Sequence, residues 1–201
     1  MPPSTSSLRP PPRVGSARWP TALLLALLIS ACGDDPFQIR WSAAPDTVLL
    51  YSLARPELDL HSAFNFTQRS TVRIEAPDET GEWDVALDTQ GGQLVLLPPG
   101  ALGIDSRAQV AELPGRTLDE VEEAPSDTLL YAAVQPVPVQ LGSVYVIRTR
   151  SVAGAYGSKC VYFAKLAPLE IDMTEGRLRF VFEMNPVCND RQLVPPEYSP
   201  E

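Results

Sequence analysis

The chain is predicted to be mainly β, folded as a β-sandwich or as an open, barrel-like sheet. Two observations predict this class. Several short segments alternate apolar and polar residues with a period of two, which is the pattern of a half-buried strand. Twenty-one prolines are spread along the 201 residues, so long helices are not expected.

The expected strands are short and are separated by turn residues. Residues 46–51, 71–75, 143–150, 160–173 and 177–184 fit strands, and residues 82–97 fit a hairpin that turns at Gly91-Gly92. Along the first half of this hairpin, one face is expected to be buried (Trp83, Val85, Leu87) and the other solvated (Asp84, Ala86, Asp88).

One short helix is expected near residues 117–124. Thr117 and Glu120 have the spacing of a capping box, and Pro125 follows as a stop signal. The carboxylates near its start would also favour the helix N-terminus.

Two segments of similar sequence raise the question of an internal repeat. Residues 44–51 (APDTVLLY) resemble residues 124–131 (APSDTLLY). One interpretation is a duplicated β unit, with related halves at 46–123 and 124–193. The other interpretation is that similar strand-forming sequences occur twice by chance in a β protein. The sequence does not decide between these two interpretations.

The first 31 residues have the character of an export signal. Residues 1–20 contain three arginines and no acid, and residues 21–30 are an uncharged, mostly apolar run. Ten residues are too few to span a bilayer, which takes about 20, but they suit the apolar region of a signal peptide. The run ends in Ile29-Ser-Ala-Cys32, which resembles the lipobox of bacterial lipoproteins. The alternative is an ordinary cleavage site with a coincidental cysteine.

The lipobox resemblance implies a domain organisation and a location. Residues 1–31 would be removed, and Cys32 would carry lipid and hold the chain on a membrane of the cell envelope. Gly33 follows Cys32 in place of the Asp associated with inner-membrane retention, so the outer membrane is favoured. Residues 32–45 would then form the lipidated tether, 46–193 the β-rich domain and 194–201 a disordered tail.

Charge and composition exclude several classes of partner. Three of the 16 basic residues precede Cys32 and all 25 acidic residues follow it, so the mature part has a net charge of −12. Such a surface repels phosphate backbones, and nucleic-acid binding is not expected. No phosphate-binding glycine loop is present, and no cofactor is predicted.

The two cysteines that remain after Cys32 are predicted to form a disulfide. Residues 160–173 and 177–184 read as a hairpin with its turn at Thr174-Glu-Gly176, and Cys160 and Cys188 are equally distant from that turn. The cell envelope expected for an exported chain is also an oxidising compartment, which favours the bridge. In the return strand, one set of side chains is expected to face inward (Leu178, Phe180, Phe182, Met184) and the other to face water (Arg177, Arg179, Glu183).

No residue pattern identifies an enzyme. His61 is the only histidine, so a histidine-rich metal site is excluded, and no nucleophile elbow accompanies it. Asp84 and Asp88 fit a solvated strand face better than a catalytic pair. The acidic run Asp119 to Asp127 lacks the spacing of a calcium loop, and no metal site is predicted. The first choice for ligand binding is the loop 152–159 with Tyr156.

The mature part also loosely resembles uncharacterised secreted lipoproteins of unknown function. The resemblance rests on residues 83–88, 94–98 and 160–166 and on Asn185-Pro-Val-Cys188. It implies a fold but no activity. The expected function is therefore an envelope-anchored, non-enzymatic binding or structural domain. The alternatives are a carboxylate-dependent envelope hydrolase and an accessory subunit of an envelope assembly machine, with an envelope protein as partner.

Overall fold

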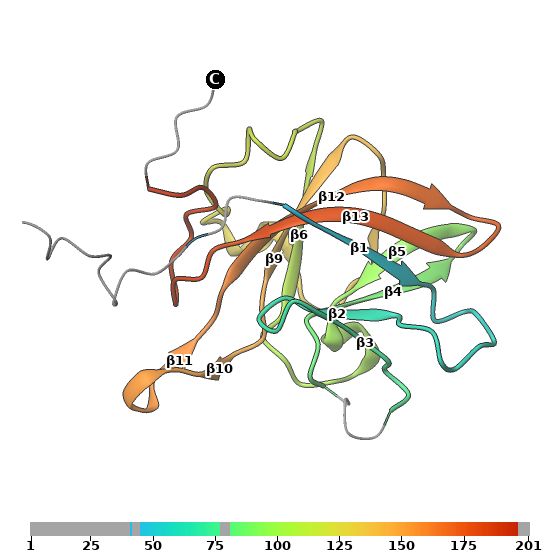
Figure 1. The fold of residues 1–201 in the computed structure, drawn as a ribbon, viewed down its shortest axis with the longest axis horizontal. Coiled ribbons are helices and arrows are strands. Elements are labelled where there is room, and N and C mark those ends of the chain that lie inside the picture. The colour runs from blue at the N-terminus through green and yellow to red at the C-terminus, as the bar shows by residue number, and fades with distance from the viewer. Residues whose placement is uncertain (1–40, 42–44, 77–80, 197–201) are drawn as a thin grey trace, which may run out of the picture. The chain divides into compact units, whose positions relative to one another are not determined.

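Strands account for almost all the regular structure, which confirms the predicted class. The computed structural model describes residues 41, 45–76 and 81–196, all within a compact unit that spans residues 39–201 (Figure 1). Its strands are β1 (Asp46–Tyr51), β2 (Ala63–Asn65), β3 (Ser70–Val72), β4 (Val85–Gln90), β5 (Gln93–Leu97), β6 (Gln109–Pro114), β7 (Tyr131–Ala132), β8 (Val137–Pro138), β9 (Ser143–Arg148), β10 (Val152–Ala153), β11 (Lys159–Cys160), β12 (Phe163–Asp172) and β13 (Arg177–Met184). The short 3-10 turns are η3 (Pro99–Leu102), η4 (Thr128–Leu130) and η5 (Ala155–Gly157).

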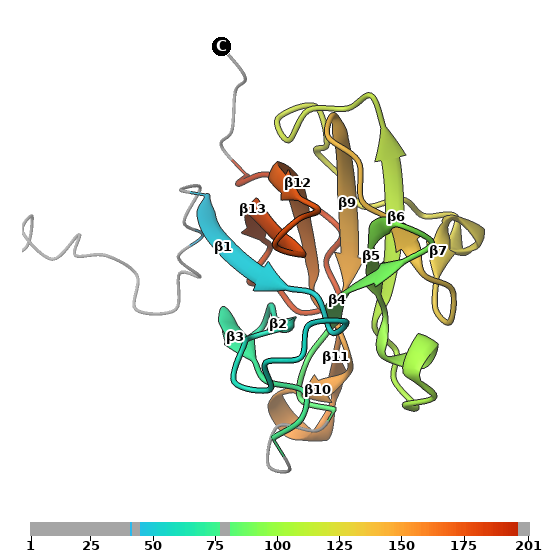
Figure 2. The same cartoon turned by 90° about the vertical axis from the view of Figure 1, so that its right-hand side faces the viewer.

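Two antiparallel sheets form the sandwich (Figure 2). One has the strand order β1-β13-β12-β9-β6-β7 and the other β3-β2-β4-β5-β8, while β10 and β11 form a separate two-stranded ribbon. The hairpin expected at residues 82–97 is confirmed as β4 and β5. Its turn has Gly91 and Gly92 at φ of 58° and 79°, values that favour glycine.

Apolar clusters cover both faces of each sheet. The largest lies between the sheets and includes Leu50, Phe64, Phe66, Val85, Leu87, Tyr145, Ile147, Leu166, Phe180 and Phe182. A second covers the outer face of the six-stranded sheet (Ala111, Val121, Ala124, Val144, Val146, Phe163, Leu193), and a third covers the outer face of the five-stranded sheet (Ala63, Val72, Trp83, Ala86, Val95, Leu97).

The third cluster overturns the expected solvated face of the first hairpin. Ala86 is completely buried because loop residues such as Leu53, Ile74 and Ile104 pack around it. Asp84 is also completely buried, against the backbone N–H groups of Phe66 and Arg150.

The alternation correctly places Val85 and Leu87 on the face toward the other sheet and Ala86 on the opposite face. It is wrong for Trp83, which precedes β4 and packs with Ala86 in the third cluster. It also does not reveal that irregular segments cover this opposite face.

Residues 117–124 form a turn and then an extended segment, so the prediction of a helix there is wrong. The local signal does operate, because the backbone N–H of Thr117 donates to the Glu120 carboxylate at 2.7 Å. The helix does not continue, since the backbone N–H of Ala124 donates to the carbonyl of Arg191 at 2.8 Å instead. Pairing with a segment far along the chain therefore replaces the second turn.

A buried lysine holds this segment against the sheet. The Nζ atom of Lys165, on β12, donates to the carbonyl oxygens of Leu118 and Val121 at 2.8 and 3.1 Å. It also lies 3.1 Å from the carboxylate of Glu183, and the Lys165 side chain is 1% exposed. Glu183, expected to face water, thus contacts a cation beneath the segment that covers the sheet.

The two similar segments have different structures, so the interpretation as a repeat is wrong. Residues 46–51 form a strand in which Leu50 is buried, whereas Leu130 lies in the 3-10 turn η4 and is 52% exposed. Each sheet also takes strands from both proposed halves. The resemblance between the segments is therefore one of sequence only.

The strand register places several connections at one end of the six-stranded sheet. Asp46 at the start of β1 pairs with Phe182 near the end of β13, and Phe163 at the start of β12 pairs with Arg148 at the end of β9. The turn between β12 and β13 lies at the opposite end, as Figure 1 shows. We call the end where β1 begins the β1-start end. In the described part of the chain, no helix is long and apolar enough to span a membrane.

Candidate functional site

The loop that follows β13 is built around one buried amide side chain. The Nδ2 atom of Asn185 donates to the carbonyl oxygen of Gln192 at 2.8 Å and to the carboxylate of Asp190 at 3.0 Å. Its Oδ1 atom accepts a hydrogen bond from the backbone N–H of Val187 at 2.7 Å. Because Asn185 is 0% exposed and uses both ends of its amide, the loop 185–192 has a defined shape.

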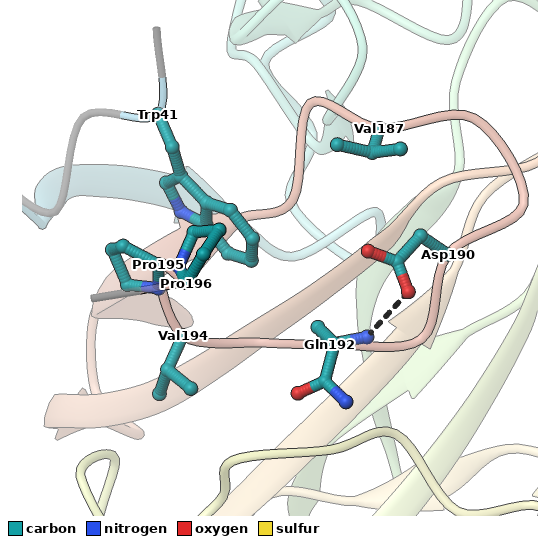
Figure 3. Close-up of a pocket in the computed structure, with 7 residues that line it drawn as sticks. All are labelled: Trp41, Val187, Asp190, Gln192, Val194, Pro195 and Pro196. Carbon is teal, nitrogen blue, oxygen red and sulfur yellow. Dashed lines mark hydrogen bonds between the residues drawn. The ribbon is translucent and has the colours of Figure 1, made fainter. Parts of the chain in front are cut away.

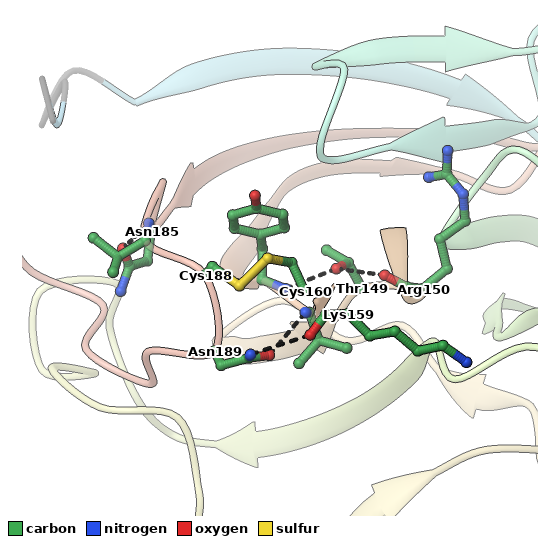
Figure 4. The surroundings of a disulfide bond; sticks show 10 residues. Thr149, Arg150, Lys159, Cys160, Asn185, Cys188 and Asn189 are labelled. Carbon is green, nitrogen blue, oxygen red and sulfur yellow. Dashed lines mark hydrogen bonds between the residues drawn. A yellow bond between two sulfur atoms is a disulfide. The ribbon is translucent and has the colours of Figure 1, made fainter. Parts of the chain in front are cut away.

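A disulfide joins this loop to the ribbon β10–β11. Cys160 and Cys188 are bonded with their Cα atoms 5.1 Å apart, which confirms the predicted pair (Figure 4). The ladder that pairs Ala164 with Met184 leads outward to these two cysteines, as the hairpin argument expects. The bulge between Pro168 and Glu170 lies between the turn and the cysteines and shifts the register by one residue. The register on the cysteine side of the bulge, with Ala164 opposite Met184, is the one that continues to Cys160 opposite Cys188.

Asn189 adds a second connection beside the disulfide. Its backbone N–H donates to the carbonyl of Val161 at 2.9 Å, and its Oδ1 atom accepts from the N–H of the same residue at 3.0 Å. Its Nδ2 atom donates to the carbonyl of Lys159 at 3.2 Å. The φ of Asn189 is 59°, a left-handed conformation that asparagine tolerates better than most residues. The loop and the ribbon therefore form one braced unit at the β1-start end.

The loop and the chain segments beside it enclose a mostly apolar pocket, which we call the Trp41 pocket. Its volume is about 460 Å³. Figure 3 shows the indole of Trp41 beside Pro195 and Pro196, with Asp190 and Gln192 along another side. The lining residues are Trp41, Val187, Asp190, Gln192, Val194, Pro195 and Pro196.

The lining of the Trp41 pocket suits contact with an apolar group. Five of its seven lining residues are apolar, and they offer an indole, two proline rings and two valine side chains. The Asp190 carboxylate accepts hydrogen bonds from the Asn185 side chain and from the backbone N–H of Gln192 at 3.0 and 3.2 Å. It therefore shapes the loop and has no acid–base partner among the lining residues.

The sequence patterns did not predict this pocket. Trp41 was expected in the tether and residues 194–196 in a disordered tail. Val194, Pro195 and Pro196 are placed against Trp41 in the structure, so the tail prediction is wrong for them, while residues 197–201 lie outside the described residues. The available signal was the cluster of turn formers in Asn185-Pro-Val-Cys-Asn189, which marks a structured loop.

Tyr156, the first choice for ligand binding, does not line the Trp41 pocket. It lies in η5, at the tip of the ribbon β10–β11, with a φ of 56° and a relative exposure of 108%. Nothing in the described part of the chain covers its side chain. A binding role for Tyr156 stays a prediction. Cys32, the expected lipid site, lies outside the described residues.

Asp84 is the only completely buried carboxylate of the described residues, and its partners give it a structural role. It accepts hydrogen bonds from the backbone N–H groups of Phe66 and Arg150 at 2.8 and 2.7 Å. Burial raises the pKa of this carboxyl above its ordinary value, and this outweighs the hydrogen bonds and the nearby Arg150 guanidinium. Asp84 thus joins the two sheets and is closed to a substrate.

A second, polar cavity of about 540 Å³ lies beside Asp84, near the base of the ribbon. It contains Glu82 and Asp105 together with Arg107, Arg150 and Lys159. Glu82 is ion-paired with Arg150 and both acids are exposed, so neither has the buried, unpaired environment of a glycosidase general acid.

The other candidate groups are separate from both cavities. His61 is exposed in a loop, where its backbone carbonyl accepts from the N–H of Tyr51. Within the described residues, no cluster of His, Cys, Asp or Glu could hold a metal ion. In the acidic run Asp119 to Asp127, the Glu120 carboxylate accepts the backbone N–H of Thr117.

No model of a known protein family matches the chain, and no curated protein matches it either.

Proposed function

We propose that the chain is a lipoprotein of the bacterial cell envelope, attached to the membrane through Cys32. The support comes from the sequence: an arginine-containing start, a short apolar run and the lipobox-like Ile29-Ser-Ala-Cys32. The outer membrane is favoured by Gly33. With a net charge of −12 and no polybasic segment, the mature chain needs the lipid for stable attachment.

We further propose that the mature domain is a non-enzymatic binding module whose ligand site is the Trp41 pocket. One observation carries this proposal: an apolar pocket is built at the β1-start end by a loop that a disulfide and Asn185 hold in place. The volume and the apolar lining suit a small apolar ligand or an apolar side chain of a partner.

The anchor is tested on the full chain in a bacterial host. Wild-type protein is expected to incorporate radiolabelled palmitate, to fractionate with membranes, and to show acyl mass on Cys32 in its N-terminal peptide. Cys32→Ser should remain unprocessed and unlabelled. Mature protein with an unmodified Cys32 would contradict the proposal.

The pocket is tested on residues 33–201, which contain the whole described fold. The neutral apolar dye Nile red is the probe, and quenching of tryptophan emission is the readout. Trp41 and Trp83 are the only tryptophans in residues 33–201, and Trp83 is buried. Quenching by the dye therefore reports on the pocket if the Trp41→Phe substitution abolishes it.

A matched pair of substitutions gives this test its specificity. Val194→Glu places a carboxylate in the pocket and should weaken dye binding by about tenfold or more. Val134→Glu makes the same change at an exposed site outside the pocket and should leave binding unchanged. Equal affinities of the two variants would refute the Trp41 pocket as the binding site.

A further inference from the structure

We infer that the tip of the ribbon β10–β11 is a second membrane contact, in which Tyr156 and Lys159 rest in the headgroup region of an anionic phospholipid surface. This inference rests on the proposed lipid attachment, because the anchor brings the ribbon to the bilayer. It gives a role to the most exposed aromatic side chain of the described residues, which the Trp41 pocket does not use.

The topology directs the ribbon toward the side from which the tether leaves. The ribbon connects the end of β9 to the start of β12, and both ends lie at the β1-start end of the sheet. The tether enters β1 at that same end. Figure 1 shows the ribbon extending beyond the sheet there, away from the β12–β13 turn. Trp41 is held in the Trp41 pocket, and the eight residues between Cys32 and Trp41 reach at most about 29 Å, which lets the anchor and the ribbon meet one bilayer.

The ribbon has a charge opposite to that of the rest of the domain. No acidic residue occurs between Asp127 and Glu170, although the mature chain has a net charge of −12. Lys159, on β11, is exposed and forms no ion pair with a described carboxylate, and Arg107 is exposed beside it in the polar cavity. Glu82 and Asp105 share that cavity, but the Arg150 guanidinium is paired with Glu82.

The conformation of the tip keeps Tyr156 outward. The backbone N–H of Gly154 donates to the carbonyl of Ser158 at 2.8 Å, which closes a tight turn. The turn lies against the disulfide: a Cβ atom on Gly154 would be 2.5 Å from the Cys160 sulfur. A turn braced in this way presents the tyrosine without the entropy cost of ordering a mobile loop.

The two side chains match the chemistry of a bilayer interface. A tyrosine has an apolar ring and a polar hydroxyl, and aromatic residues of this type are enriched at headgroup level. A lysine near an anionic surface contributes about fivefold in affinity. Half-burying the tyrosine ring contributes about tenfold. Each contact is weak alone and becomes significant because the anchor supplies a high local concentration.

The experiment replaces the natural anchor so that the two proposals fail separately. Residues 33–201 carry an N-terminal histidine tag and are held on vesicles that contain a nickel-chelating lipid and brominated phosphatidylglycerol. Tyr156→Trp is the reporter, in a Trp41→Phe background where the other tryptophan, Trp83, is buried. Met173→Trp, in the exposed turn between β12 and β13 at the opposite end of the sheet, is the matched control.

The bromines are expected to quench the reporter at position 156 and not the control at position 173. Lys159→Gln should reduce the quenched fraction by about fivefold, and so should neutral brominated phosphatidylcholine. Equal quenching of both reporters, or quenching of neither, overturns the inference. A reporter that is unquenched by lipid but responds to an envelope protein would also overturn it and assign the tip to protein docking. None of these results depends on lipid at Cys32, which mass spectrometry tests independently.

Discussion

Lys165→Met tests whether a buried lysine holds the segment 117–124 on the sheet. The substitution removes an ion pair with Glu183 and the hydrogen bonds to the carbonyls of Leu118 and Val121. Breaking a buried pair by removing one partner costs about 3–5 kcal/mol. Glu183 keeps 15% of its side-chain surface exposed, so the carboxylate left behind is partly hydrated and the lower end applies. We expect a loss of about 3 kcal/mol.

The assay is urea unfolding of residues 33–201 with a double-mutant cycle. The chain contains only two lysines, and Lys159→Met at the exposed one is the control, with an expected change below about 0.5 kcal/mol. Adding Glu183→Gln to Lys165→Met should recover about 2 kcal/mol of the summed single losses. The amide of Ala124 should also exchange faster in Lys165→Met, since the segment that carries it is no longer held. A loss below about 1 kcal/mol, or a coupling near zero, would refute the reasoning.

Three further outcomes are expected. Denatured, unreduced protein should have no titratable thiol in residues 33–201, and two free thiols would contradict the disulfide. Replacing Cys160 and Cys188 by Ala should lower the free energy of unfolding by about 3–4 kcal/mol, because the bridge spans 28 residues. Burial raises the pKa of Asp84 above its ordinary 3.8, so its contribution to the free energy of unfolding should fall as pH rises from about 4 through the folded-state pKa. Asp84→Asn should remove that slope in pH-dependent urea unfolding, and an unchanged slope would assign it to other groups. His61→Ala should change the free energy of unfolding, measured with urea, by less than about 0.5 kcal/mol, because the side chain is exposed. A larger loss of stability would show that the imidazole makes a stabilising interaction.

Local patterns predicted the parts of the fold that depend on neighbouring residues. The strand at 177–184 matches β13, and Gly91-Gly92 forms the turn of the first hairpin. The disulfide also belongs here, because Cys160 and Cys188 are related by a single hairpin whose turn the sequence marks with Gly176. The period of two and the turn chemistry locate these strands and turns, while the folded sheet sets the one-residue register shift at Pro168 that aligns the cysteines.

The tertiary structure decided everything that depends on what covers a face of a sheet. Asp84 and Glu183 have the sequence pattern of solvated positions, yet irregular segments from elsewhere in the chain bury one and nearly bury the other. The Trp41 pocket likewise brings together Trp41, which precedes β1, and residues 187–196, which follow β13. The capping contact at Thr117 forms as the sequence predicts, but backbone pairing with Arg191 outweighs the weak local preference for a helix. Periodicity reports which side chains share a face, whereas burial depends on contacts between distant segments, which a single sequence does not encode locally.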